Sequence, residues 1–198
     1  MESLSPSSPA TLWAHHGAQH RAVMAESLAT LGDVVAQSAE LLADALVAGG
    51  KVIAFGNGGS AAQASHLAGE LMGRFDGTRT PLPALALPAD AGVATCIGND
   101  FGYDALFARQ VQALVRPGDV ALGLTTSGTS RNVLNGLTEA HRQGATTIAL
   151  TGAGGLHGDV PVDCLIAVPS DATALVQEVH LLILHVWCQW IDHVITSA

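Results

Sequence analysis

The sequence predicts an α/β fold, a doubly wound parallel sheet flanked by helices, with further helices before the sheet and a long buried helix after it. Three observations support this prediction. Short apolar runs of four or five residues alternate with longer segments of helical pattern, as parallel strands with crossover helices do. Turns rich in glycine or hydroxyl groups follow two of these runs, at the edge where ligands bind in such sheets. The final segment, residues 173–196, is apolar nearly all round, as a buried helix is.

The size of the chain fits one domain. With 198 residues it can bury one substantial core, and we expect a single domain over residues 10–198 that includes an N-terminal helical extension. Residues 1–9 lack the charged start and apolar block of a signal peptide, and we expect a disordered tail there. Apolar residues make up 48% and charged residues 13% of the chain, which predicts a homo-oligomer whose subunits cover apolar surface.

Net charge and cysteine usage narrow the function classes. The formal net charge is −9 with only eight Lys and Arg residues, which argues against nucleic acid as a partner. The three cysteines, Cys96, Cys164 and Cys188, cannot all pair within the chain, and they lie in apolar runs. This predicts reduced thiols in a cytoplasmic protein. His185 and Gln189 interrupt the longest apolar stretch, which is too short to span a bilayer, so no membrane partner is expected.

The chain before the sheet is predicted to be helical. Residues 10–48 have a helical pattern with a break near Asp33, which we expect to cap the second helix. His16 and His20 are four residues apart, a spacing that suits a metal site. No carboxylate or cysteine supports that interpretation, so we expect them to be exposed helix side chains.

The first strand and the turn after it give the strongest indication of a site. Residues 51–55 form an apolar run, after which Gly56, Gly58 and Gly59 allow the chain to reverse and a helix to begin. The start of a helix presents unpaired N–H groups and a partial positive charge. The sequence therefore predicts an anion or polyol site at this turn.

The helix after this turn contains two ionisable side chains. Ser60 is predicted to be its N-cap, and Gln63, three residues later, completes a capping-box pattern. His66 and Glu70 are four residues apart and therefore lie on one face of the helix.

A second strand is predicted at residues 84–87, followed by a helix that begins near Asp90 and ends in a turn at residues 98–102. Asn99 and Asp100 in that turn are side chains that bind sugar hydroxyl groups. Turn chemistry explains them equally well, because Asn and Asp beside Gly favour turns.

A third strand, residues 120–124, runs into a loop crowded with hydroxyl groups. Five of the six positions from 125 to 130 are Ser or Thr, which predicts a phosphate cradle built from hydroxyls and helix N–H groups without a lysine. A purely structural Ser/Thr turn is the alternative. After a helix at residues 103–115 and another that ends near residue 141, strands at residues 147–151 and 164–168 complete the sheet.

The last helix contains few polar residues, among them Gln177, Glu178, His180 and His185. A buried histidine is more often a hydrogen-bonded core residue than a ligand. This helix alone leaves both roles open for His185.

Taken together, the motifs resemble the phosphoheptose isomerases, or sedoheptulose 7-phosphate isomerases, of the sugar isomerase (SIS) domain superfamily. The motifs are the turn at 56–60, the Ser-His-Leu-Ala-Gly-Glu at 65–70, the Gly-Asn-Asp at 98–100, the loop at 125–130 and the Gln-Glu and later His within 177–185. The resemblance covers the chain from about residue 20 onward. It implies a cytoplasmic homotetramer with active sites at subunit interfaces. It also implies conversion of sedoheptulose 7-phosphate into D-glycero-D-manno-heptose 7-phosphate, for nucleotide-activated heptose biosynthesis, with zinc in many members.

The resemblance assigns roles to particular positions. The general base and acid would be Glu70 and His185, and the ligands of one Zn²⁺ would be His66, Glu70, Gln177 and His185. The substrate contacts would be Asn57, Gly58, Gly59, Ser60, Glu70, Asn99, Asp100, Thr125, Thr126, Ser127, Ser130 and Gln177. In two places the chain departs from the family. Thr125 replaces the usual Ser but keeps a hydroxyl, and Asp171 is shifted relative to the Asp-Thr that precedes the Gln-Glu pair in many members.

Aldose–ketose isomerisation moves a proton between adjacent carbons through an enediol, so it needs a base and an acid. Glu70 and His185 fit these roles, because a carboxylate gains basicity in apolar surroundings and a histidine exchanges protons near neutral pH. Zinc would polarise the carbonyl group. Two interpretations of zinc stay open: Glu70 leaves the metal when substrate binds, or the metal is partly structural.

Two other functions are compatible with the same fold. One is that of a non-catalytic SIS-domain binding protein, of the type that associates with the bacterial replication initiator. That class lacks the helix glutamate and the late histidine, which this chain has at positions 70 and 185. The other is an isomerase of a different sugar phosphate, for example in a surface-glycan pathway, which nothing in the sequence excludes.

Overall fold

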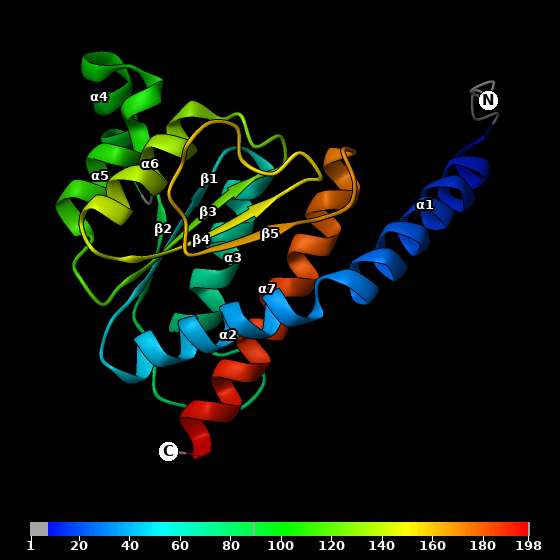
Figure 1. Cartoon of the computed structure of the whole chain (residues 1–198), viewed down its shortest axis with the longest axis horizontal. Helices are drawn as coiled ribbons and strands as arrows, with labels where there is room; N and C mark the ends of the chain where they lie inside the picture. Colours follow the sequence, from blue (N-terminus) through cyan, green and yellow to red (C-terminus); the bar gives the residue numbers. More distant parts are fainter. Residues whose placement is uncertain (1–7, 89, 198) are drawn as a thin grey trace.

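The computed structural model describes residues 8–88 and 90–197, and its centre is a parallel β-sheet (Figure 1). The strand order within these residues is β2-β1-β3-β4-β5, with every neighbouring pair parallel. The strands are β1 (Val52–Gly56), β2 (Ala84–Leu87), β3 (Val120–Thr125), β4 (Thr146–Thr151) and β5 (Cys164–Ala167). The predicted sheet is confirmed.

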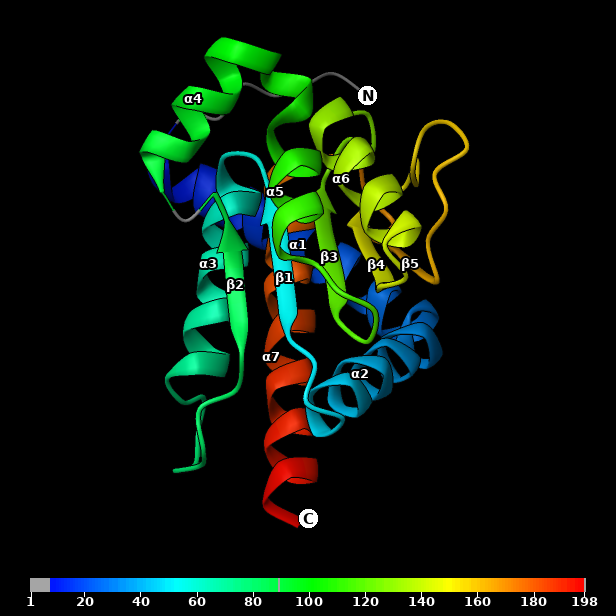
Figure 2. The same cartoon turned by 90° about the vertical axis from the view of Figure 1, so that its left-hand side faces the viewer.

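Helices cover both faces of the sheet. They are α1 (Pro9–Thr30), α2 (Gly32–Val47), α3 (Gly59–Met72), α4 (Ala91–Phe101), the short 3₁₀ helix η1 (Tyr103–Ala105), α5 (Leu106–Leu114), α6 (Arg131–Arg142) and α7 (Thr173–Ser197). In Figure 2, α5 and α6 lie in front of the strands and α7 lies behind them. The doubly wound arrangement predicted from the sequence is therefore confirmed.

Strand β1 shows why its sequence is apolar at every position. Val52 and Ala54 point into the core shared with α2, α3 and α7. Ile53 and Phe55 point into the core on the other face, where the ring of Phe55 stacks on that of Phe107 with centroids 5.2 Å apart. A strand buried on both faces has no position for a polar side chain.

Helix α7 is the central helix of its layer. Its buried side chains include Trp187, whose indole N–H donates a 2.9 Å hydrogen bond to the Ser38 hydroxyl of α2. Among the described residues it is the one helix long and apolar enough to cross a membrane, by length and composition only. Half of its most apolar window is buried inside the fold, as in the core helix of a globular domain.

Two expected helix starts differ from the structure. The break between α1 and α2 lies at Leu31, so Asp33 falls in the first turn of α2 and makes no cap. Helix α1 begins at Pro9, where the Ser8 hydroxyl accepts a hydrogen bond from the Thr11 N–H at 3.2 Å. Ser8 and Pro9, which were expected to belong to a disordered tail, therefore form the start of α1. Residues 1–7 of that expected tail lie outside the described residues.

Helix α4 is longer than the sequence predicts. Asp90 caps it as expected, with its carboxylate accepting from the N–H groups of Gly92 and Val93. The helix then continues through Phe101, so Asn99 and Asp100 lie on its last turn and not in a loop. The expected turn at 98–102 was wrong because Gly98 is tolerated within the helix, and the chain turns only at Gly102, where φ is +81°.

The N-terminal histidines have a partner that the sequence did not reveal. The rings of His16 and His20 on α1 donate to the two carboxylate oxygens of Glu178 on α7, at 2.6 and 2.5 Å. Partial burial raises the pKa of Glu178, but the bonds from the two histidines outweigh it and hold that pKa below its usual value. The two side chains are 45% and 39% exposed, in line with the expected exposed helix residues, but a carboxylate does support them. These contacts attach α1 to α7.

His180 lies in the core of the domain. Its side chain is fully buried, and its Nε2–H donates to the Thr151 carbonyl at 3.1 Å. Burial lowers the pKa of His180 to about 4, against a smaller opposite effect of the bond to Thr151. The ring is therefore neutral in the folded protein at neutral pH.

This burial predicts a pH-dependent stability. Between pH of about 6.5 and about 4 the unfolded chain binds a proton at His180 that the folded chain does not, so stability falls as the pH falls. The free energy of unfolding should lose about 2 kcal/mol from this group between pH 7 and pH 5. His180→Gln keeps an amide donor for Thr151 and should remove that part of the loss. Urea unfolding of both proteins at the two pH values measures it, and equal losses would contradict the prediction.

Candidate active site

The C-terminal edge of the sheet contains a cavity of about 260 Å³. It forms there because β1 and β3 are neighbours, with Gly56 paired to Leu124, so the turn after β1 and the loop after β3 lie side by side. Ten residues line it: Asn57, Gly58, Gly59, Ser60, Leu124, Thr125, Thr126, Ser130, Thr173 and Gln177. The structure thus brings together most of the substrate contacts expected from the sequence.

Glycines shape the first wall of this cavity. Gly58 has φ of +54°, which other residues rarely adopt. A Cβ on Gly59 would lie 2.6 Å from the Gln177 amide, so a side chain there would collide with α7. Gln63 donates to the Gln177 carbonyl at 2.6 Å and does not bond the start of its own helix. The expected capping box is wrong, and α3 begins without a side-chain cap.

The hydroxyl-rich loop forms the second wall. Thr125 donates to the Ser130 hydroxyl at 3.3 Å, which draws the two ends of the loop together. Helix α6 starts after Ser130, also without a side-chain cap. Two helix N-termini therefore direct uncapped N–H groups toward one cavity, the arrangement that binds phosphate. Ser127 is exposed and bonds Thr129, so it lies outside the cavity lining.

A hydrogen-bonded network that the sequence did not reveal holds Asn57. Its Oδ1 accepts from the Tyr103 hydroxyl at 2.8 Å and from Asn132 Nδ2 at 2.8 Å. Its Nδ2 donates to Asn132 Oδ1 at 2.9 Å. Asn57 thus keeps one N–H free for a ligand. The only sequence signals were that Asn132 ends the hydroxyl loop and that Tyr103 is the single tyrosine.

Asn99 and Asp100 do not reach the cavity. Asn99 donates to Asp100 at 2.7 Å, and the other Asp100 oxygen accepts from the Cys96 thiol. Both side chains are exposed on α4, and neither lines the cavity. Figure 2 shows α4 beyond the C-terminal end of β2.

The ionisable side chains form a second cluster, between α3 and α7. The Nε2 atoms of His66 and His185 are 3.0 Å apart, and His66 Nε2 lies 3.5 Å from a Glu70 carboxylate oxygen. The Glu70 side chain is 23% exposed and that of His66 39%, so a small molecule can approach them. One carboxylate and two imidazoles therefore form a cluster in which His66 contacts both Glu70 and His185.

The four expected zinc ligands divide between these two places. Gln177 lines the cavity, while His185 lies eight residues further along α7, a rise of about 12 Å. No hydrogen bond joins Gln177 to His66, Glu70 or His185. Within residues 8–88 and 90–197, no group of three or more His, Cys, Asp or Glu side chains is placed so that it could hold a metal ion.

Comparison with known proteins identifies the family. The SIS domain model matches residues 15–152. The phosphoheptose isomerase of Aquifex aeolicus is 50% identical over 157 residues, which cover 79% of this chain and 82% of that one. The chain belongs to the phosphoheptose isomerase family.

Solved structures of phosphoheptose isomerases agree with this fold. The structure from Neisseria gonorrhoeae has a TM-score of 0.85 at 40% identity and covers 94% of this chain and 100% of that one. The structure from Francisella tularensis has a TM-score of 0.88 at 36% identity and covers 94% and 99%. The predicted SIS fold and family are confirmed.

The hydrogen bonds of Asn57 predict that removing the Tyr103 hydroxyl weakens phosphate binding. Tyr103→Phe deletes the bond to Asn57 Oδ1, so the turn that forms the first wall of the cavity is held less firmly. Affinity for inorganic phosphate, measured by calorimetry, should fall about threefold, as loss of one partly exposed neutral hydrogen bond predicts. Circular dichroism should show an unchanged fold, because Tyr103 is exposed. An unchanged affinity would show that Tyr103 does not support the site.

Proposed function

We propose the reaction and the residues that perform it as follows. The chain is an aldose–ketose isomerase that converts sedoheptulose 7-phosphate into D-glycero-D-manno-heptose 7-phosphate, as its membership of the phosphoheptose isomerase family indicates. The observation that best supports the chemistry is the cluster of Glu70, His66 and His185 beside a hydroxyl-lined cavity. The product feeds nucleotide-activated heptose biosynthesis.

Glu70 and His185 divide the proton transfers between them. Glu70 removes a proton from C1 of the ketose, and His185 donates one to the C2 carbonyl oxygen, which gives the enediol. The enediol then returns its O1 proton to His185, and Glu70 delivers its proton to C2. Both residues end in the state in which they began, and the sugar has become an aldose.

The spacing of the two parts of the site supports a long substrate. Gly59 lies at the cavity and His66 at the ionisable cluster, seven residues apart on α3, a rise of about 10 Å. In a heptose 7-phosphate the reacting carbons and the phosphate are at opposite ends of the carbon chain. A phosphate at the cavity would therefore place C1 and C2 toward Glu70 and His185.

We also propose that one Zn²⁺ per chain binds at His66, Glu70 and His185. Two imidazole nitrogens that face each other at 3.0 Å, with a carboxylate oxygen 3.5 Å from one of them, are donors of the kind that zinc prefers. Because the described residues contain no ready-formed group of three such ligands, Glu70 would move toward the histidines to complete the set. When bound, the ion would polarise the substrate carbonyl.

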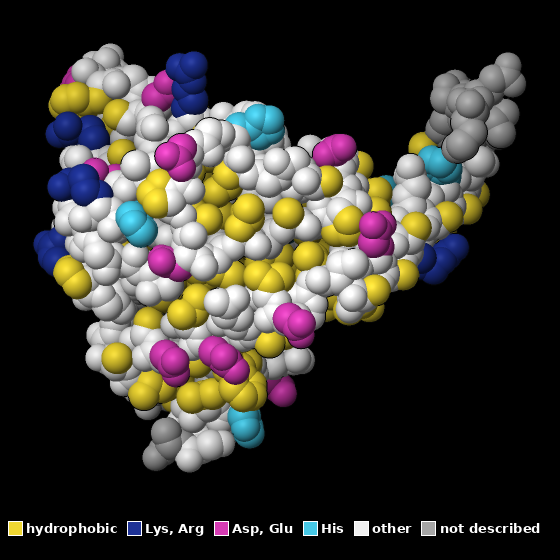
Figure 3. Space-filling model, in the orientation of Figure 1, with side chains coloured by type: hydrophobic (Ala, Val, Ile, Leu, Met, Phe, Trp, Pro, Cys, Tyr) yellow, Lys and Arg dark blue, Asp and Glu magenta, His cyan; other side chains and the backbone are white. Residues whose placement is uncertain are grey.

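We propose a homotetramer with shared sites as the assembly. An apolar groove of about 260 Å³ runs between α1, α2 and α7, lined by Leu28, Leu31, Val35, Leu182, Val186 and neighbouring residues. Leu28 is 68% and Trp13 82% exposed in the single chain, a high exposure for large apolar side chains. Figure 3 shows hydrophobic side chains along the α1 arm and across the body beside it. A second copy would cover this surface.

The cytoplasm remains our proposed location for the protein. Cys96, Cys164 and Cys188 are all free, and the thiols of Cys164 and Cys188 are buried. Burial raises the pKa of the Cys188 thiol to about 12, so it stays protonated. Unpaired cysteines of this kind are typical of a reducing compartment.

The reaction and its base can be tested together. Purified protein should convert sedoheptulose 7-phosphate into the heptose 7-phosphate, followed by NMR. Glu70→Gln should keep the fold but lower kcat by about 10²–10⁴-fold, because it removes the base and preserves the shape. Ketose 6- and 5-phosphates serve as controls for the substrate. Turnover of Glu70→Gln near the wild-type rate would contradict its role, and preference for a shorter sugar would contradict the substrate.

Zinc binding can be tested by metal content. His66→Ala and His185→Ala should each lose bound zinc, since neither helix alone supplies a stable site. His141→Ala, an exposed histidine on α6, should keep it. Size-exclusion chromatography should show the same assembly for all variants, because apolar helix faces hold it together. Full zinc occupancy in either of the first two variants would show that α3 and α7 do not share an ion.

A further inference from the structure

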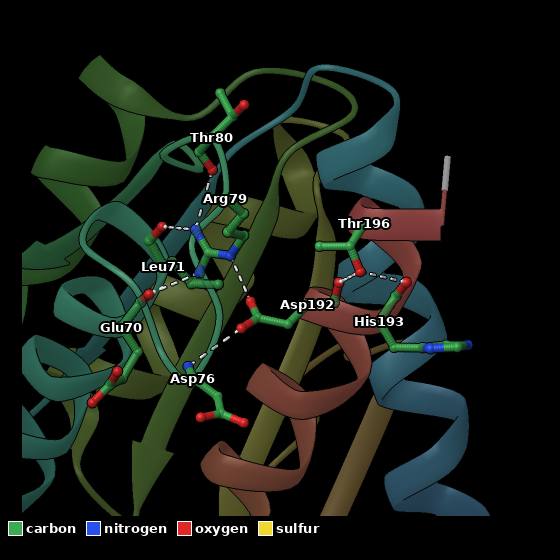
Figure 4. Close-up of polar contacts among 8 residues, drawn as sticks. All are labelled: Glu70, Leu71, Asp76, Arg79, Thr80, Asp192, His193 and Thr196. Carbon is green, nitrogen blue, oxygen red and sulfur yellow. Dashed lines mark hydrogen bonds and ion pairs between the residues drawn. The ribbon is translucent and has the colours of Figure 1, made fainter.

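Arg79 joins the ends of the two helices that contain the ionisable cluster (Figure 4). It belongs to the connection between α3 and β2, and its side chain is only 2% exposed. Its Nη2 donates to the Glu70 carbonyl at 2.8 Å and its Nη1 to the Leu71 carbonyl at 2.8 Å. Its Nε donates to the Asp192 carboxylate of α7 at 2.5 Å. One guanidinium group thus holds α3 and α7 together.

The bonds to α3 satisfy a need of that helix. The last carbonyl groups of a helix have no partner within it and form the negative end of its dipole. Helix α3 has no basic residue in its last turn. Arg79, in the segment after α3, supplies both the hydrogen-bond donors and the positive charge that the end of this helix lacks. One of the two carbonyls that it bonds belongs to Glu70, the proposed base.

The bond to α7 fixes the helix that contains the proposed acid. Asp192 lies seven residues after His185, which is two turns along the same face of α7. Cys188 lies between them and is buried, with a raised pKa that keeps its thiol uncharged beside Glu70, Asp192 and Arg79. The ion pair of Arg79 and Asp192 therefore holds α3 and α7 together two helical turns beyond His185.

We propose that Arg79 is a positioning residue for the isomerisation, which rests on the function proposed above. By holding the Glu70 carbonyl and Asp192 at once, it fixes the separation of the base on α3 from the acid on α7. Proton transfer depends steeply on such a separation, and a misplacement of about 1 Å can cost about a hundredfold in rate.

Lysine cannot replace this arginine. The guanidinium group is planar and has N–H donors on three nitrogens, so it can bond two adjacent carbonyls and a carboxylate in one plane. A lysine ammonium is a single point that can keep the charge pair with Asp192 but not the whole set of bonds. The phosphate cavity lies at the opposite end of α3, at Gly59 and Ser60, and does not depend on these bonds.

The test compares Arg79→Lys with a matched control. Arg142→Lys makes the same change at an arginine that is 66% exposed and pairs with Glu139 on α6. Steady-state kinetics with sedoheptulose 7-phosphate should show kcat lowered about tenfold to a hundredfold in Arg79→Lys, with KM within threefold of wild type. Arg142→Lys should match wild type in both. Affinity for inorganic phosphate should be unchanged in Arg79→Lys, which shows that the protein is folded.

A second variant separates positioning from the ion pair. Asp192→Asn leaves an acceptor for Nε and keeps both carbonyl bonds, so its kcat should fall less than that of Arg79→Lys. A kcat of Arg79→Lys within twofold of wild type, or an equal loss in Asp192→Asn, would overturn the proposal. If the wild type is active and either of these two results is found, the positioning role of Arg79 is wrong but the proposed function stands. A wild type without turnover overturns the proposed function as well.

Discussion

The site depends on the side-by-side packing of α3 and α7. Both helices run in the same direction, and they meet at three levels. Gly59 lies against Gln177, His66 faces His185, and Arg79 joins the end of α3 to Asp192. Because each level involves residues more than a hundred positions apart, the distance between the proposed base and acid is a property of the packed domain.

The two ends of this contact differ in chemistry, as the proposed binding of a long sugar phosphate along it requires. At the N-terminal end the cavity contains glycines, hydroxyls and amides, and none of its lining residues is Lys or Arg. In a protein with net charge −9, the uncapped starts of α3 and α6 therefore supply partial positive charge at this cavity. Further along the helices the side chains are ionisable, as proton transfer requires.

Helix α1 connects the site to the proposed assembly. Its His16 and His20 bond Glu178, which follows Gln177 of the cavity directly in the chain. The remainder of α1 extends from the body of the domain (Figure 1). Its large apolar side chains Leu12, Trp13 and Leu28 are exposed. A neighbouring copy that packs on this arm would therefore be linked, through the bonds of α1 to Glu178, to the helix turn that lines the cavity.

The sequence by itself determined the strands, the two loops that form the cavity, and the helix face shared by His66 and Glu70, because apolar runs, glycine turns and four-residue spacing are local properties. It did not determine where α4 ends or how α3 is capped, since Gly98 and Ser60 have favourable alternatives that packing decides. Only the tertiary structure decided the contacts of Tyr103, Asn132 and Arg79. The same is true of the pairing of His16 and His20 with Glu178. Each depends on a contact between distant segments, and single-sequence patterns contain no information about such contacts.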